Sequence, residues 1–293
     1  MIYFDLHCDT LLEAFSNNKT LYDNGFHIDL SKTGDLEDYT QVLAVYSRNR
    51  DDPDVIYDRF FRVMDYYEKI RPSDPRFHAV FGVEGGKLLN GDITRLDRLH
   101  EKNVKILTLV WGGECCIGGA HDTSLGLTPF GYEVLFRLWE LGMIPDVSHA
   151  SFAMTRQVLD EALKRGKPVI ASHSCSYAIH PHTRNLRDED AKDIASLGGL
   201  IGTSVVTFHL CGDQPCTVET MTDHIVHYLS VCGEDTPCMG SDFDGTDGLP
   251  EGLDGIGSIG TLYDSIASRT HSQRIADKVF YENAQAFSNR YFK

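Results

Sequence analysis

The chain alternates between short apolar runs and longer segments in which apolar residues recur every three or four positions. The short runs are rich in β-branched and aromatic residues, which favours strands. They predict eight strands, at residues 2–7, 41–46, 78–83, 105–110, 144–147, 169–172, 200–205 and 238–242. The segments between and after them predict helices near residues 54–70, 92–102, 129–141, 151–165, 188–197, 217–232, 258–268 and 271–289.

The helix predicted over 129–141 has well-defined ends in the sequence. Thr128 offers an N-cap hydroxyl, and Pro129 suits the first helical position, where a missing N–H costs nothing. Gly142 follows the last apolar residue and tolerates the positive φ that ends many helices. Gly166 and Pro168 end the next predicted helix in a similar way. The apolar residues expected to face inward within 129–141 are Phe130, Val134, Leu135, Leu138 and Leu141.

The strand runs are nearly continuous in apolar residues, which is typical of strands in a parallel sheet covered by helices. Eight strand–helix units favour an α/β fold closed into a (β/α)8 TIM-type barrel over an open doubly wound sheet. One such barrel uses about 250 residues, whereas a prior of about 150 residues per domain suggests two domains in 293. No linker or repeat interrupts the pattern, so we predict a single domain over 1–293, with long loops at 17–38 and 245–260.

Composition excludes several classes of partner. Lysine and arginine number 27 against 43 aspartates and glutamates, a net charge of −16 that disfavours nucleic acid and anionic membrane surfaces. We find neither a transmembrane run nor a signal peptide in the sequence. The eight cysteines contain no C-x-x-C pair, which predicts free thiols and a cytoplasmic location, and disfavours a zinc–thiolate site. A redox role for the adjacent Cys115 and Cys116 is disfavoured as well.

Metal-binding residue types gather at the ends of the predicted strands, where barrel enzymes carry their chemistry. They are His7, Asp9, Glu84, His149, His173 and Asp242. His7 and Asp9 are two residues apart and point to the same side of an extended segment. His149 and His173 follow adjacent strands, so a second metal ion can lie there, with Glu84 bridging the two. Two ions about 3.5–4 Å apart lower the pKa of a bound water and supply a hydroxide at neutral pH.

Purely structural roles for these residues compete with the metal-site interpretation. A single histidine near a strand end is more often structural, but the ordered set favours a site. Asp244 fits a loop-capping role, and Asp242 is the better catalytic candidate because it lies closer to the strand. The histidines without such context are expected to be solvated or packed: His27, His78, His100, His224, His227 and His271.

Seven motifs in this order resemble the membrane (renal) dipeptidase family, peptidase family M19, over nearly the whole chain. They are His-x-Asp at 7–9, Val-Glu-Gly-Gly at 83–86, Gly-Leu-Thr-Pro-Phe-Gly at 126–131, Asp-Val-Ser-His at 146–149, Ser-His-Ser at 172–174, Arg-Asn at 184–185 and Gly-Ser-Asp-Phe-Asp-Gly at 240–245. The resemblance implies an amidohydrolase-type barrel that hydrolyses dipeptides with two zinc ions per chain. A homodimer is compatible with it, although no apolar stripe predicts one.

The resemblance also implies a role for each residue. His7 and Asp9 would bind one Zn²⁺, His149 and His173 the other, and Glu84 would bridge them. Asp242 would transfer the proton near the substrate amine, and Arg184 would bind the substrate's C-terminal carboxylate. A guanidinium suits that second task because it pairs with a carboxylate through two parallel hydrogen bonds.

One position departs from the family pattern. Members with dipeptidase activity carry a histidine that contacts the scissile carbonyl after the fourth strand, where this chain has Trp111. An indole N–H can donate a hydrogen bond to an oxyanion but cannot transfer protons, so Trp111 either donates or lines the substrate pocket. His121, ten residues later, is an alternative donor. Two other functions stay open: hydrolysis of another small amide, such as an N-acyl amino acid, and metal binding by a degenerate site.

Overall fold

The computed structural model describes residues 1–46 and 50–292. In that part of the chain, seven parallel strands form one curled sheet in the order β5-β4-β3-β2-β1-β7-β6. The strands are β1 (Ile2–Cys8), β2 (Asp38–Tyr46), β3 (Phe77–Glu84), β4 (Val104–Thr108), β5 (Ile144–Asp146), β6 (Ile201–Thr203) and β7 (Pro237–Met239). The longest ladder joins β2 to β3, from Tyr39 opposite Phe77 to Tyr46 opposite Glu84.

The predicted strand at 169–172 is not a full strand, but it closes the ring. Ile170 pairs in parallel with Asp146 of β5, and Ala171 pairs with Ile201 of β6. The ladder stops there because the Ser172 N–H donates to the Asp146 carboxylate, at 2.9 Å, and not to a backbone carbonyl. The predicted closed (β/α)8 arrangement is therefore confirmed, with one strand reduced to a pair of bridges.

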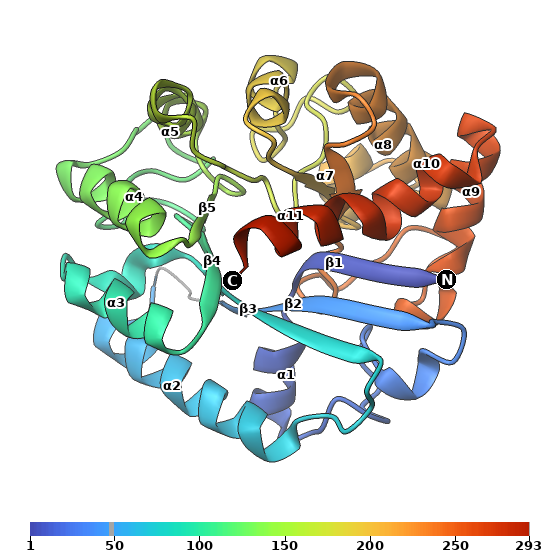
Figure 1. Ribbon diagram of the computed structural model, residues 1–293, viewed down its shortest axis with the longest axis horizontal. Coiled ribbons are helices and arrows are strands. Elements are labelled where there is room, and N and C mark those ends of the chain that lie inside the picture. The colour runs from blue at the N-terminus through green and yellow to red at the C-terminus, as the bar shows by residue number, and fades with distance from the viewer. Residues whose placement is uncertain (47–49, 293) are drawn as a thin grey trace.

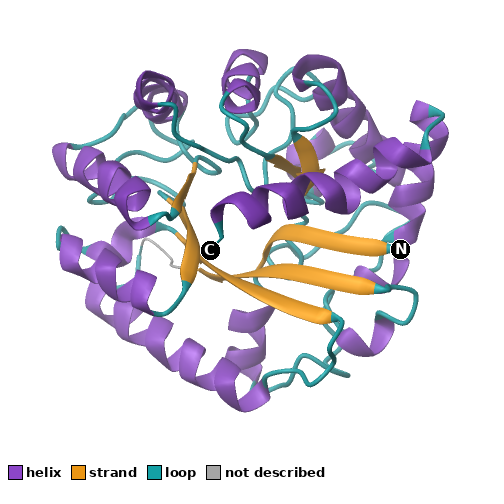
Figure 2. Ribbon diagram, in the orientation of Figure 1, coloured by secondary structure: helices purple, strands orange, loops and turns teal. Residues whose placement is uncertain are grey.

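Helices pack around the strands, most of them on the outside of the ring (Figures 1 and 2). They are α1 (Thr10–Asn17), α2 (Pro53–Ile70), α3 (Ile93–Glu101), α4 (Pro129–Leu141), α5 (Phe152–Arg165), α6 (Asp188–Ser196), α7 (Thr207–Cys211), α8 (Val218–Cys232), α9 (Gly260–Thr270), α10 (Gln273–Asp277) and α11 (Asn283–Tyr291). None of the described helices is both long and apolar enough to cross a membrane.

Three helical features differ from the sequence prediction. Helices α1 and α7 were not predicted, because eight and five residues are too few to display a 3.6-residue period clearly. The single helix predicted over 271–289 is divided into α10, a π-helical turn at Lys278–Glu282 and α11. The periodicity does not reveal this division because the three pieces follow one another without a break.

Both predicted ends of α4 and the predicted C-terminal end of α5 are confirmed. The Thr128 hydroxyl accepts a hydrogen bond from the Gly131 N–H at 2.9 Å, and Gly142 ends α4 with a φ of 73°. The Ser151 hydroxyl accepts from the Met154 N–H at 3.0 Å, and Gly166 ends α5 with a φ of 58°.

The interior of the barrel is filled with apolar side chains near the starts of the strands. Phe4 of β1, Ile106 of β4 and Ile170 belong to this cluster, and so do Ala284 and Phe287 of α11. Helix α11 crosses this end of the ring in Figure 1 and covers it. The polar strand ends are consequently left to form a site at the opposite end of the barrel.

Candidate metal centre

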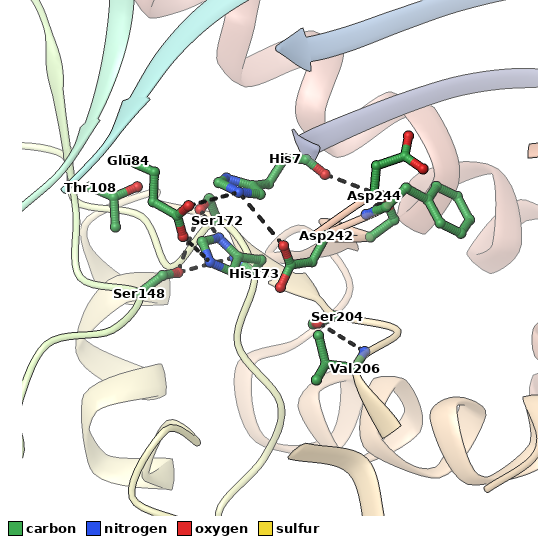
Figure 3. A network of polar contacts seen from close by, with 12 residues as sticks. His7, Glu84, Thr108, Ser148, Ser172, His173, Ser204, Val206, Asp242 and Asp244 are labelled. Carbon is green, nitrogen blue, oxygen red and sulfur yellow. Dashed lines mark hydrogen bonds and ion pairs between the residues drawn. The ribbon is translucent and has the colours of Figure 1, made fainter. Parts of the chain in front are cut away.

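The six predicted ligand and catalytic side chains converge at the C-terminal end of the barrel, although they are up to 235 positions apart in the sequence. Their nitrogen and oxygen atoms form three groups, each with all its atoms within 4.8 Å of one another: His7, Asp9 and Glu84; Glu84, His149 and His173; and His7, His173 and Asp242. Glu84 belongs to the first two groups, which is the arrangement expected of a carboxylate lying between two metal ions. Figure 3 shows Glu84 beside His173, with His7 between Glu84 and Asp242.

Glu84 at the end of β3 lies at the centre of this cluster. Its Oε1 is 2.8 Å from His149 Nε2 and 3.2 Å from His173 Nε2, and its Oε2 is 3.8 Å from His7 Nε2. The two Nε2 atoms of His149 and His173 are only 3.0 Å apart. The ring of His7 lies over that of His173, with centroids 3.8 Å apart.

Hydrogen bonds on the far side of two imidazoles decide which nitrogen faces the cluster. His149 Nδ1 lies 2.8 Å from the Trp111 carbonyl, which can only accept, so Nδ1 carries the proton. His173 Nδ1 lies 2.7 Å from Ser172 Oγ, whose own proton goes to Asp146 at 2.5 Å, so Nδ1 donates here too. Both Nε2 lone pairs therefore point at Glu84, as metal coordination by neutral imidazole requires.

The protonation of the cluster follows from its burial. Desolvation lowers the pKa of His149 and His173 well below 6.5, and lowers that of His7 to about 3 with help from the Arg184 charge. Desolvation raises the pKa of Glu84 well above its usual range, and the nearby Asp9 carboxylate adds to this effect. Neutral imidazoles beside carboxylates that resist ionisation are groups that a divalent cation would stabilise together.

Two unsatisfied atoms point to the same conclusion. Within the described structure, His7 Nε2 and Asp9 Oδ1 are buried and lack a hydrogen-bond partner. Buried polar atoms are rarely left unpaired, and such an atom calls for an explanation such as an ion. Imidazole nitrogens and carboxylate oxygens are the donors that Zn²⁺ accepts, so these residues fit a metal centre of that kind.

Two residues of the cluster have a left-handed backbone. His149 has a φ of 69° and Asp242 a φ of 64°, values that non-glycine residues seldom adopt. The His149 turn is held by its carbonyl, which accepts from the His121 N–H at 2.7 Å. Such local strain, on the order of 1–3 kcal/mol per residue, is common where a side chain must be aimed into a functional site.

A pocket of about 690 Å³ opens above the cluster. Its lining includes Asp9, Glu84, His149 and Asp242 together with Tyr46, Trp111, His121, Arg184 and His209. The rings of Trp111 and Tyr46 pack on each other at 4.8 Å and form one wall. Arg184 is buried, and its guanidinium donates to Ser174 Oγ at 3.4 Å and to the His173 carbonyl at 3.2 Å. The Nε of Arg184 has no partner in the described structure.

The sequence interpretation missed His209 as a lining residue. It lies on α7, a five-residue helix after β6, so neither a strand end nor a helical period marked it. Burial, with the Arg184 charge, lowers the pKa of His209 to about 2 and that of His121 to about 4. Both imidazoles are therefore neutral and can accept or donate hydrogen bonds in the pocket.

Asp244 holds the long loop that follows α1. Its carboxylate accepts from Thr10 Oγ1 at 2.5 Å and from the backbone N–H groups of His27 and Ile28 at 2.6 and 3.3 Å. Its own N–H donates to His27 Nδ1 at 3.0 Å. This geometry agrees with the loop-capping interpretation of Asp244, and it gives His27 a specific partner in place of solvent.

Comparison with known proteins identifies the family to which the chain belongs. The sequence pattern of the membrane dipeptidase family, peptidase family M19, matches residues 57–287. An uncharacterized dipeptidase of Schizosaccharomyces pombe is 30% identical over 210 residues, which are 68% of this chain and 49% of that protein. The chain thus spans about half the length of this curated relative.

Two solved structures share the fold over their whole length. Dipeptidase AC, a metallopeptidase of family M19, has a TM-score of 0.89 at 21% identity and covers 100% of this chain, with 99% of its own chain matched. A metallopeptidase from Rhodobacter sphaeroides, solved with a phosphinate mimic of the dipeptide L-Ala-D-Ala, has a TM-score of 0.83 at 21% identity with 99% of both chains covered. The predicted TIM-type fold of the M19 amidohydrolases is thereby confirmed.

Proposed function

Because this chain belongs to the membrane dipeptidase family, peptidase family M19, we propose that it is a zinc-dependent dipeptidase. The observation that carries the proposal is the pair of ligand groups that share Glu84 at the floor of the pocket. A buried cation, Arg184, lies at the wall of the same pocket. A dipeptide offers a peptide bond to the metal-binding groups and a terminal carboxylate to Arg184.

The proposed ligands divide into two sets with one member in common. His7 and Asp9 would hold one Zn²⁺, His149 and His173 would hold the other, and Glu84 would contact both. Bound zinc ions would polarise the peptide carbonyl and lower the pKa of the attacking water.

Asp242 is proposed as the residue that moves the proton. Burial raises its pKa to about 6, and the opposing Arg184 charge is the next largest influence. A carboxylate with a pKa near neutral can accept a proton from the attacking water and return it to the leaving amine. Its position, with Oδ1 3.8 Å from His7 Nε2, places it beside the proposed ligands.

Arg184 is proposed to bind the free carboxylate of the substrate's C-terminal residue. The guanidinium is already desolvated and fixed by Ser174 and the His173 carbonyl, so little ordering remains to be done on binding. A fixed cation at one distance from the metal centre would measure substrate length and restrict the site to short peptides. Trp111 and Tyr46 would contact an apolar part of the substrate on the opposite wall.

The test is removal of metal with a chelator, followed by addition of Zn²⁺ and a panel of dipeptides. The panel includes L-Ala-D-Ala, because a mimic of that dipeptide occupies the Rhodobacter sphaeroides relative. We expect about two zinc ions per chain and zinc-dependent cleavage of at least one dipeptide. Zinc-loaded protein that cleaves none of them would refute the dipeptidase assignment.

One observation favours a second substrate class for the same centre. Where family members with dipeptidase activity carry a histidine that contacts the scissile carbonyl, this chain has Trp111, whose ring packs against Tyr46. An N-acyl amino acid keeps the carboxylate for Arg184 and offers an apolar acyl group to that wall. Adding N-acyl amino acids to the panel separates the two classes. Zinc binding without cleavage of either class would instead indicate a degenerate, metal-binding site.

A further inference from the structure

Two fully buried aspartates lie directly beneath the candidate metal centre and belong to none of its ligand groups. They are Asp5 of β1 and Asp146 of β5, each 0% exposed. Both precede a proposed ligand closely in the chain, since Asp5 comes two residues before His7 and Asp146 three before His149. Each also accepts a hydrogen bond from a serine that directly precedes another site residue. Asp146 bonds Ser172, before His173, and Asp5 bonds Ser241, before Asp242.

Asp146 ties together three neighbouring segments of the barrel. Its Oδ1 accepts from the backbone N–H groups of Ser148 and Ser172, both at 2.9 Å. Its Oδ2 accepts from the hydroxyls of Thr108 and Ser172, both at 2.5 Å. Ser172 Oγ in turn accepts from His173 Nδ1 at 2.7 Å, so the carboxylate is connected to a proposed ligand through one hydroxyl. Figure 3 shows Thr108, Ser148 and Ser172 grouped around His173 and Glu84.

Asp5 makes the equivalent contacts on the other side of the centre. Its Oδ1 accepts from the Ser241 N–H at 2.8 Å and from the His7 N–H at 3.2 Å. Its Oδ2 accepts from the hydroxyls of Tyr3, at 3.2 Å, and Ser241. Ser241 Oγ also lies 3.3 Å from the His7 carbonyl, and that carbonyl accepts from the Asp242 N–H at 3.0 Å.

We propose that Asp5 and Asp146 are positioning residues that each orient one half of the metal centre. Asp146 orients His149 and His173 through Ser148 and Ser172. Asp5 orients His7 and Asp242 through the backbone around Ser241. The inference rests on the proposed binding of two metal ions, and it adds that each half of the centre is oriented by its own aspartate.

The physical reason is the orientation of the ligand lone pairs. A histidine can present Nδ1 or Nε2 to a metal, and a partner that accepts from one nitrogen leaves the other free to coordinate. Ser172 can accept from His173 only while its own proton is directed elsewhere, and the Asp146 carboxylate takes that proton. Without Asp146 or Ser172, the His173 ring can rotate or change tautomer, and coordination must then include the cost of restoring its orientation.

The variants Ser172→Ala and Ser241→Ala test the two halves separately. Metal-free protein is titrated with Zn²⁺ against a chromogenic chelator. We expect two binding steps in the unmodified protein and, in each variant, one step weakened about 10–100-fold while the other stays within about threefold. The double variant is expected to weaken both steps. Ser176→Ala is the matched control, because this buried hydroxyl has no hydrogen-bond partner in the described structure and its loss is expected to change neither step.

Assignment of the halves uses a ligand variant. In a His149→Gln background, one binding step is already lost, so Ser172→Ala is expected to have little further effect, whereas Ser241→Ala weakens the remaining step. The opposite pattern would contradict the assignment of Asp146 to the half that contains His149 and of Asp5 to the other half.

A second measurement needs no variant of the network. Long-range ¹⁵N–¹H correlation spectra of the unmodified protein report which imidazole nitrogens carry protons. We expect His173 Nδ1 to be protonated both without and with zinc, as its bond to Ser172 Oγ requires. A His173 with an unprotonated Nδ1 would overturn the role of Ser172 and Asp146 even if the alanine variants failed to fold.

The outcomes separate this inference from the proposed function. Unmodified protein that binds no zinc would refute the proposed function and the inference together. Unmodified protein that binds two zinc ions, with Ser172→Ala and Ser241→Ala binding them equally well, would refute only the inference.

Discussion

Replacing Glu84 with glutamine tests the centre most directly, because this carboxylate is the only member common to the two proposed zinc-binding groups. Its Oε1 lies 2.8 Å from His149 Nε2 and its Oε2 lies 3.8 Å from His7 Nε2, so the substitution weakens both metal positions at once. The amide has nearly the same shape and is neutral. Packing is therefore preserved, and the change isolates the charge.

The expected effects have opposite signs with and without metal. At free zinc equal to 100 times Kd, each bound ion stabilises the folded protein by about 2.7 kcal/mol; a 100-fold weaker site gains only about 0.4 kcal/mol at the same zinc concentration. With about 2–4 °C of Tm per kcal/mol in a protein of this size, the zinc-induced rise falls from about 5–10 °C to about 1 °C per site. Without zinc, the variant is expected to be more stable than the unmodified protein, because burial already raises the pKa of Glu84 and disfavours its charge.

The assay is a thermal melt of chelator-treated protein with and without added Zn²⁺, combined with metal analysis. Glu101→Gln is the control, since Glu101 is exposed on α3 and forms an ion pair with Arg98 across one helical turn. It is expected to change neither the metal-free Tm nor the response to zinc. A Glu84→Gln protein that retains two zinc ions and the full rise in Tm would refute the bridging role. A metal-free variant that melts below the unmodified protein would contradict the expected gain in stability and show that the Glu84 carboxyl stabilises the metal-free fold.

Four further substitutions extend these tests. Arg184→Met removes a charged hydrogen-bond partner worth about 1.5–3 kcal/mol, so kcat/KM for dipeptides should fall about 10–150-fold, while dipeptide amides, which lack the carboxylate, should be affected far less. Trp111→Ala removes the wall shared with Tyr46, and kcat/KM should fall more for substrates with large apolar side chains than for glycine-containing ones; an equal loss for both would argue against a contact with the substrate side chain. Phe287→Ala opens the covered end of the barrel and should lower the free energy of unfolding by about 3–5 kcal/mol, measured by urea titration. Thr128→Ala removes the N-cap of α4 and should cost about 1 kcal/mol in the same titration, with zinc binding unchanged.

The candidate site was predictable because its proposed ligands share a local signature. His7, Glu84 and His173 each follow or end an apolar run, and in a parallel barrel all such ends meet at one face. The roles proposed for them still await the experiments above. Trp111 directly follows the apolar run at 105–110, which led us to expect it in the substrate pocket, and it does line the pocket.

Other contributions to the site leave no mark on the sequence. His209 reaches the pocket from α7, which is too short to show a period. Tyr46 ends β2, which is separated from β4 by β3, and it meets Trp111 only because both segments end at the same face of the barrel. Asp5 resembles any other polar residue within a strand until Ser241, 236 positions away, is brought against it. Their roles arise from contacts between distant segments, and single-sequence patterns carry no information about those.

The sequence by itself determined the alternation of strands and helices, both ends of α4, the C-terminal end of α5, and the order in which metal-binding residues occur, because each depends on side chains a few positions apart. The tertiary structure decided which segments complete the ring and which lone pairs face one another. The segment at 169–172 illustrates both parts: its apolar residues predict a strand, yet the Asp146 carboxylate takes the Ser172 N–H and ends the ladder there. A buried acceptor from a neighbouring strand outweighs local β propensity at that point, since a hydrogen bond to a carboxylate contributes more than one ladder hydrogen bond between neutral groups.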